Sequence, residues 1–88
     1  MNTLNDLKPR EYGIILSIGS SGALRRRIID MGLTPGAKVI MIKHAPFGDP
    51  IEINVRGYSL SIRKSEAREI IIEPQGRITY DKNNKKNN

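Results

Sequence analysis

The chain has no cysteine and no tryptophan, and it has only one histidine among its 88 residues. Without cysteine it cannot form disulfides or thiolate metal sites, and this composition fits a reducing cytoplasm. Its four aromatic residues are too few for a platform on which nucleic-acid bases stack in series. The longest apolar run is Val39–Ile42, far short of the roughly 20 residues that span a bilayer. We therefore expect a protein that does not insert into a membrane directly.

Residues that could perform catalysis or bind a metal are also scarce. His44 has Asp49 and Glu52 nearby in the sequence, but zinc and iron sites generally need three or four convergent ligands at recognisable spacing. The glycine-serine segment 19–22 lacks the lysine and the full spacing of a phosphate-binding loop, so a tight turn and helix cap explain it better. The sequence predicts no enzyme, no cofactor and no metal site.

Charge is distributed unevenly along the chain, whose net charge is +6. Residues 75–88 hold four basic residues and one acidic residue, so half of the excess positive charge lies there. After Asp81 this segment contains only asparagine and lysine, which leaves it nothing to bury. We predict one folded domain over residues 1–74 and a disordered basic tail over residues 75–88.

Short runs of β-branched and alternating apolar residues predict five strands. The first covers residues 13–18, with Ile14, Leu16 and Ile18 on one face. A tight hairpin is expected where Arg56-Gly57 separates the third strand from the fourth, and Pro74 is expected to end the fifth. One helical turn at residues 65–68 precedes that last strand. The remaining predicted strands cover residues 37–44, 51–56, 58–63 and 69–73, with Ile51, Ile53, Val55, Tyr58, Leu60 and Ile62 inward.

One short helix is predicted between the first and second strands. Ser20 and Ser21 are candidate N-caps. Gly32 is suited to the left-handed position after a helix, Leu33 to the apolar contact that follows it, and Pro35 bars continuation. The apolar residues recur at spacings of four and three along one stripe: Leu24, Ile28 and Met31, with Ile29 beside them.

Five short, mostly antiparallel strands with one helix favour a mainly all-β fold, a small five-stranded β-barrel. A domain of this size needs an economical core, and closing the sheet removes the edges that a small open sheet would expose.

Arg25, Arg26 and Arg27 form the sharpest concentration of charge. Because Leu24 and Ile28 point inward on the predicted helix, the three arginines lie on its solvent side. A plain solvated helix face accounts for at least one of them, and arginine also suits phosphates. Without interleaved aromatic rings, docking on an acidic protein surface is favoured over nucleic acid.

The segment Ala45-Pro-Phe-Gly-Asp-Pro50 is the most unusual loop. Its two prolines restrict it, and a stiff loop loses little entropy when a partner binds. Phe47 is interpreted either as an exposed anchor at the tip or as a plug over one end of the barrel. Together with the helix, the candidate partner-binding residues are Arg25, Arg26, Arg27, Pro46, Phe47, Gly48, Asp49 and Pro50.

Three segments in order resemble the ferrous iron transport protein A family, FeoA. They are Ile28-Ile-Asp-Met-Gly-Leu-Thr-Pro-Gly36, Ala45-Pro-Phe-Gly-Asp-Pro-Ile51, and Val55-Arg-Gly57 followed by Leu60-Ser-Ile-Arg-Lys-Ser-Glu-Ala67. The resemblance covers about residues 4–74, and the basic tail lies outside the family pattern.

The resemblance implies an SH3-like β-barrel and a cytoplasmic accessory or regulatory role in the Feo system for ferrous iron uptake. The implied partner is the membrane transporter FeoB, with docking on its cytoplasmic GTP-binding part. The chain would then lie at the inner face of the membrane through that partner. The family motif positions do not form a metal site, so transition-metal binding is only a family-level association. Weak homo-oligomerisation stays open.

Two alternative functions also stay open. Metal-dependent transcriptional repressors carry a similar barrel as an appended domain, although these residues leave no room for a helix-turn-helix ahead of it. A small basic nucleic-acid-binding barrel is the other alternative, and it would bind DNA with a steep salt dependence.

Overall fold

The computed structural model describes residues 2–79, so residues 80–88 of the predicted tail lie outside the described part. In chain order the elements are η1 (Leu4–Asp6), β1 (Glu11–Ile18), α1 (Gly22–Asp30), β2 (Lys38–His44), η2 (Pro46–Gly48), β3 (Ile51–Val55), β4 (Tyr58–Ile62), α2 (Lys64–Ala67) and β5 (Ile70–Arg77). The fold is mainly β, with one helix between the first two strands, as predicted. None of the helices described is long and apolar enough to cross a membrane.

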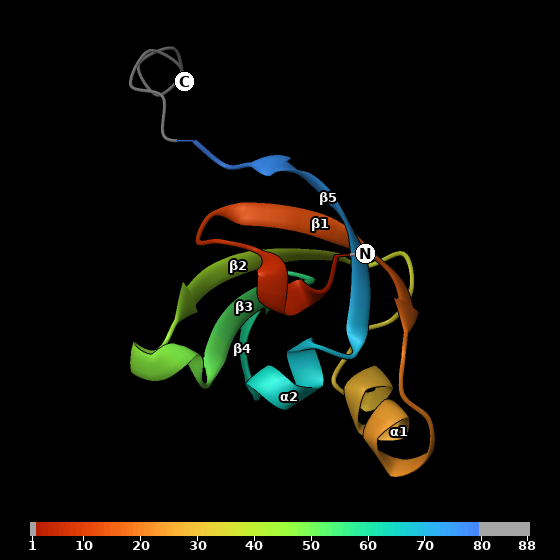
Figure 1. Cartoon of the computed structure of the whole chain (residues 1–88). Helices are drawn as coiled ribbons and strands as arrows, with labels where there is room; N and C mark the ends of the chain where they lie inside the picture. Colours follow the sequence, from red (N-terminus) through yellow and green to blue (C-terminus); the bar gives the residue numbers. More distant parts are fainter. Residues whose placement is uncertain (1, 80–88) are drawn as a thin grey trace.

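The five strands form one antiparallel sheet in the order β4-β3-β2-β1-β5, and the sheet curls around a shared interior (Figure 1). Strand β1 lies between β2 and β5, so the first and last strands are neighbours in the sheet. No ladder joins β4 to β5 within residues 2–79. Helix α2 lies across this opening, where its Ala67 is fully buried (Figure 1).

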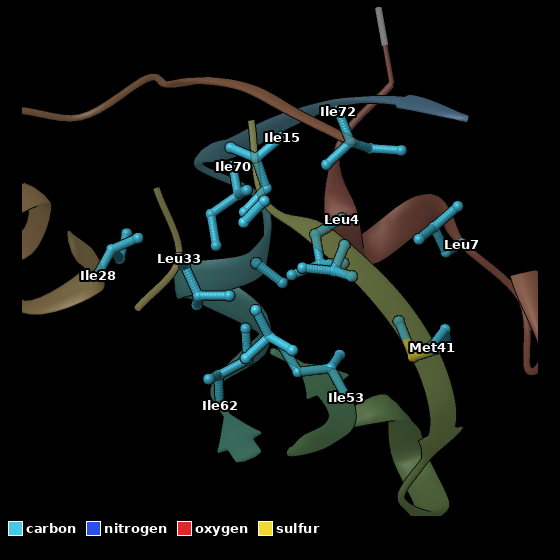
Figure 2. Packing of buried hydrophobic residues seen from close by; sticks show 14 of the residues in the cluster. Leu4, Leu7, Ile15, Ile28, Leu33, Met41, Ile53, Ile62, Ile70 and Ile72 are labelled. Carbon is cyan, nitrogen blue, oxygen red and sulfur yellow. The ribbon is translucent and has the colours of Figure 1, made fainter. Parts of the chain in front are cut away.

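Aliphatic side chains fill the interior of the curled sheet (Figure 2). Alternate residues of β3 (Ile51, Ile53 and Val55) are fully buried, as their alternation predicts. Leu4 and Leu7, from the segment around η1, are buried in the same core (Figure 2). The N-terminal segment is therefore part of the folded domain.

Strand β1 departs from the predicted side-chain face. The sequence predicts that Ile14, Leu16 and Ile18 share one face, but Ile15 is buried and Leu16 is 52% exposed. The pairing with β5 shifts register between Ile15 and Ser17. A β-bulge there adds one residue to the strand, which reverses the alternation of its side chains.

Strand β5 is longer than predicted, because Pro74 does not end it. Pro74 lies opposite Gly13, and Gly76 lies opposite the neighbouring Tyr12, so one residue of β5 is left over at a bulge. A bulge is one of the few places where a sheet tolerates proline, which has no N–H to donate. The strand therefore continues to Arg77.

Strands β3 and β4 meet in the predicted tight hairpin. Arg56 and Gly57 both have positive φ, at 53° and 88°, as a type I′ turn requires. The alternation of β4 places Tyr58 inward, but the structure leaves it 44% exposed. Its hydroxyl has a polar partner at the end of α1, described below, which explains the outward position.

Helix α1 ends as predicted but does not begin with a serine cap. Ser21 occupies the N-cap position without a capping hydrogen bond from its side chain. At the other end, Gly32 has a φ of 94° and the backbone closes a Schellman motif. The hydrogen bonds of that motif run from Leu33 N to Ile28 O at 3.3 Å and from Gly32 N to Ile29 O at 2.9 Å.

Candidate docking surface

The three consecutive arginines of α1 are all exposed, because Ile28 directs the opposite side of the helix into the core. They differ in their contacts. Arg25 Nη1 donates to Ile18 O at 3.2 Å, and Arg27 Nε donates to Glu66 Oε2 at 2.6 Å. The side chain of Arg26 makes no hydrogen bond or ion pair within the described residues.

Glu66 is the one buried charged residue among those described, with 4% of its surface exposed. Its Oε1 accepts the backbone N–H of Arg63 at 2.9 Å, while its Oε2 accepts from Arg27. Burial by itself raises the pKa of the Glu66 carboxyl, but the Arg63 N–H and the Arg27 guanidinium outweigh it and hold this pKa below its ordinary value. The carboxylate therefore stays charged and fastens α2 to α1.

All the net charge of the described residues lies on the two helices and the residues that cap α2. Residues 22–30 and 63–68 hold six basic and two acidic residues, whereas the rest of residues 2–79 hold six of each. One of the two helical acids, Glu66, is buried. We call the cationic face the following six residues: Arg25, Arg26, Arg27, Arg63, Lys64 and Arg68.

The loop from Ala45 to Pro50, called here the Phe47 loop, holds an aromatic ring in solvent. Two backbone bonds shape it, from Ala45 N to Pro50 O at 2.9 Å and from Gly48 N to Ala45 O at 2.7 Å. Phe47 has a φ of 70° and its relative exposure is 103%. Of the two interpretations of Phe47, the structure shows the exposed tip. A left-handed backbone is rare for a bulky residue, and such strain tends to occur at functional sites.

Helix α2 lies between the Phe47 loop and α1. Asp49 Oδ1 accepts the backbone N–H of Lys64 at 3.0 Å, while Glu66 binds Arg27 two residues later. In Figure 1 the segments η2, α2 and α1 lie along the same lower side of the molecule. The two groups of candidate residues predicted from the sequence thus flank one element and share one side of the barrel.

A second set of contacts holds the far end of α1. Tyr58 Oη donates to Met31 O at 2.7 Å, and Arg56 Nε donates to Gly32 O at 3.3 Å. Arg56 Nη2 also donates to Thr34 Oγ1 at 2.7 Å. A cation beside the free carbonyls at the end of a helix is favourable, so the β3–β4 hairpin fixes where α1 ends.

The residues weighed as metal ligands do not converge. His44 Nε2 lies 3.0 Å from Leu7 O, Asp49 binds the Lys64 N–H, and Glu52 Oε1 lies 3.9 Å from Lys43 Nζ. Within residues 2–79, no group of three histidine, aspartate or glutamate side chains is placed to hold a metal ion.

Sequence reasoning missed the role of α2. A helical turn is predicted at residues 65–68 and the structure has it at Lys64–Ala67, but nothing local indicates that Glu66 binds Arg27. The available signal was the density of basic residues in the segment from Arg63 to Arg68. Counting basic residues in each predicted helix, rather than looking for consecutive ones, would have grouped this segment with the arginines of α1.

Comparison with known proteins identifies the family. Residues 2–74 match the profile of the FeoA domain. Over 70 residues the chain is 29% identical to the Fe(2+) transport protein A/Fe(2+) transporter FeoB fusion protein of Porphyromonas gingivalis, in a match that covers 80% of this chain. The chain spans only 8% of the length of that relative.

Solved structures agree with this assignment. A FeoA-like protein of Clostridium acetobutylicum has a TM-score of 0.79 at 36% identity, covering 92% of this chain and 98% of that chain. FeoA of Stenotrophomonas maltophilia, solved with zinc and described as an SH3 domain protein, has a TM-score of 0.73 at 25% identity, covering 83% and 91%. A manganese-dependent transcriptional repressor shares the fold alone, with a TM-score of 0.74 at 14% identity over 84% of this chain and 41% of that chain. The predicted SH3-like β-barrel is confirmed, and the chain belongs to the FeoA family, which is linked to ferrous iron transport.

Proposed function

We propose that this chain is a non-enzymatic accessory protein of ferrous iron uptake that docks on the cytoplasmic GTP-binding part of a FeoB-type membrane transporter. The observation that carries the proposal is the Porphyromonas gingivalis relative, in which FeoA and FeoB parts share one chain. Fusion holds two domains at high effective concentration, which suits partners that act in contact. A separate FeoA chain needs a surface for the same partner, at the cytoplasmic side of the membrane.

The cationic face and the Phe47 loop together supply such a surface. Clustered positive charge steers an acidic partner and orients its approach. Phe47 offers an aromatic anchor whose backbone is already ordered, so binding does not have to order it. The matching surface on the partner is acidic and carries an apolar recess for one ring.

Binding of the full chain to the soluble GTP-binding part of FeoB, measured by calorimetry, tests the proposal. The Arg26→Glu/Arg68→Glu double variant reverses two charges whose side chains make no hydrogen bond or ion pair within the described residues, so the fold is expected to survive. We expect it to weaken binding at least about tenfold, and Phe47→Ala to do the same.

The matched control is Lys8→Glu/Arg77→Glu, which makes the same change of charge at exposed residues outside the cationic face. This control is expected to bind within about threefold of the unchanged chain. Equal losses in the control and in the Arg26→Glu/Arg68→Glu variant would mean that net charge, not this surface, determines binding. Unchanged affinity in both test variants would place docking elsewhere.

A cationic face also attracts nucleic acid, so the same chain needs a mobility-shift assay at two salt concentrations. Phe47 is the only fully exposed aromatic ring within residues 2–79, which is too little for a series of stacked bases. We expect no retarded DNA or RNA at physiological salt. Retardation that falls steeply with salt would favour the nucleic-acid-binding alternative.

A further inference from the structure

Strand β4 forms one edge of the sheet, and its outer side has no neighbouring strand within residues 2–79 (Figure 1). A two-residue turn joins it to β3, so Val55 and Tyr58, which flank the turn, exchange both of their backbone hydrogen bonds. This pairing repeats at every second residue along β4. The backbone N–H and C=O groups of Ser59 and Ser61 therefore point away from β3, toward the open side.

These four backbone groups are accessible and unbonded. Ser59 and Ser61 are both exposed, and no hydrogen bond from residues 2–79 reaches their backbone on the open side. The strand also lacks the features by which proteins protect such an edge, since Tyr58–Ile62 contains no charged residue and no proline, and its pairing with β3 has no register shift. Free donors and acceptors at strand spacing are suited to pair with another strand.

The opposite edge of the sheet, formed by β5, is protected. Ile72 N donates to Asn2 O at 2.9 Å. Thr3 forms an isolated antiparallel bridge with Ile71, so the N-terminal segment covers part of this edge. Pro74 and the bulge beside it interrupt the rest of the strand. The two edges of one sheet thus differ in protection, and only β4 is bare.

The side chains of β4 define what an added strand meets. Leu60 is partly buried and packs against the core, and Ile62 is buried in it. The exposed Ser59 and Ser61 alternate with them on the other face. An added strand continues this pattern when its apolar residues face the same way as Leu60 and its polar residues lie beside the serines. The edge therefore fits a segment of alternating apolar and polar residues.

Charge favours an acidic segment as the occupant. Strand β4 runs directly into Arg63 and Lys64, and Arg56 lies in the turn at its other end. Arg63 is exposed, and its side chain makes no hydrogen bond or ion pair within residues 2–79. A second copy of this chain is disfavoured, because antiparallel pairing of two β4 strands sets the Arg63 end of each copy beside the Arg56 turn of the other.

We propose that the open edge of β4 binds an extended acidic segment of a partner protein, which adds a strand to the sheet by β-augmentation. Backbone hydrogen bonds at Ser59 and Ser61 hold the segment, and the basic residues at the two ends of β4 select its charge. The inference goes beyond the proposed function, because it applies to any partner that carries such a segment.

Titration of the isotope-labelled full chain with a synthetic peptide, followed by amide NMR, tests the proposal. The peptide has about nine residues, with alternating valine and threonine flanked by a pair of glutamates at each end. We expect a dissociation constant on the order of 0.1 mM, with the largest amide shifts and slowed hydrogen exchange at Ser59 and Ser61. Replacing the glutamates by lysines should weaken binding at least about tenfold.

A proline on the open edge tests the role of the backbone. Ser59→Pro removes a free N–H without removing any hydrogen bond between β3 and β4, and it should weaken peptide binding at least about tenfold. The matched control Ser59→Ala keeps the N–H and should bind within about threefold of the unchanged chain.

A second comparison leaves the chain unaltered, so it does not depend on how β4 tolerates proline. Two further peptides are methylated on alternate backbone nitrogens, each on one of the two sets. The peptide methylated on the set that faces β4 should lose binding, and the other should keep it.

Four results would overturn the proposal. One is the absence of amide shifts at Ser59 and Ser61 up to about 2 mM peptide. Another is equal binding by both methylated peptides, or by the lysine and glutamate peptides. The third is equal binding by Ser59→Pro and Ser59→Ala with native spectra. The last is concentration-dependent shifts at these serines without peptide, which would make a second copy the occupant. FeoB affinity is measured with another ligand and other variants, so either proposal can fail alone.

Discussion

Strand β3 buries three of its five residues, whereas helix α1 buries one residue of nine. The sheet side of the barrel is held by ladders and core packing. The helix side is held by one fully buried side chain of α1, Ile28, and by a few polar contacts, chiefly Arg27 with Glu66 and the Tyr58 hydroxyl with Met31 O. The charge is divided in the same way: the helices and the caps of α2 carry the excess of positive charge, and the other described residues contain equal numbers of basic and acidic residues.

This division separates stability from recognition. A docking surface that rests on polar contacts can be moved or weakened while the sheet and its core stay folded. Buried side chains on the sheet side have no such freedom, because they are packed together in one core. The effects of substitutions on the two sides should therefore differ both in the size of the stability change and in the part of the molecule that is loosened.

The largest effect is expected for Ile28→Ala, which removes the only fully buried side chain of α1. We expect a loss of about 2–4 kcal/mol in unfolding free energy, measured by urea denaturation. Hydrogen exchange should speed up most in α1, because its anchor is lost while the strands keep theirs. The control Ile53→Ala should cost a similar amount and speed exchange throughout the sheet. If hydrogen exchange sped up equally in α1 and in the sheet in both variants, the proposed difference between the helix side and the sheet side would be wrong.

The next effect is expected for Arg27→Ala, which leaves the Glu66 carboxylate buried without its guanidinium. Because the Arg27 side chain is 60% exposed, the pair is partly screened, and we expect a loss of about 1–2 kcal/mol. The control Arg26→Ala removes a similar arginine that makes no hydrogen bond or ion pair within residues 2–79, and it should change stability by less than about 0.5 kcal/mol. Equal losses from the two variants would show that the Arg27 contact does not fasten the helices.

The same contact predicts a pH dependence. The pKa of Glu66 is below its ordinary value of 4.5 in the folded protein, so its contribution is fully present above that pH. It is lost as the pH falls below 4.5 and through the lower folded value. The stability difference between the unchanged chain and Glu66→Gln should therefore shrink between pH 7 and pH 3 in urea titrations. A difference that stayed constant or grew on acidification would refute this assignment.

The smallest effect is expected for Phe47→Gly, and it has the opposite sign. Glycine relieves the left-handed backbone at φ 70°, and the exposed ring has no packing to lose. We expect a gain of up to about 1 kcal/mol, reduced by the greater freedom of glycine in the unfolded chain. Phe47→Ala keeps the strained φ and should give no gain. Loss of stability in Phe47→Gly would mean that the ring supports the fold.

The sequence predicted correctly those structural features that depend on a few neighbouring residues. The alternation of β3, the tight hairpin at Arg56-Gly57, and the glycine that ends α1 are local features, and each appears as predicted. The bulges of β1 and the continuation of β5 past Pro74 depend on how two distant strands pair. No local pattern carries that information, so these predictions were wrong.

The candidate site divides in the same way. Local sequence placed Arg25, Arg26 and Arg27 on the solvent side of the helix, where the structure has them. It left the exposure of Phe47 undecided, because an aromatic residue suits either position. It also missed Glu66, which lies far from Arg27 in the sequence. Whether these residues bind a partner remains a prediction, to be tested by the binding experiments above.

The central position of β1 has a consequence for the order of folding. Glu11, at the start of that strand, pairs with Arg77 near the end of the described chain. During synthesis, the edge of β1 that pairs with β5 therefore has no neighbour until residues 70–77 have been made. The contact between the two helices likewise has to wait until Glu66, which follows Arg27 by 39 residues, has been made. The docking surface proposed above is thus complete only after α2 has been made, and we expect a nascent chain that lacks α2 not to bind a partner there.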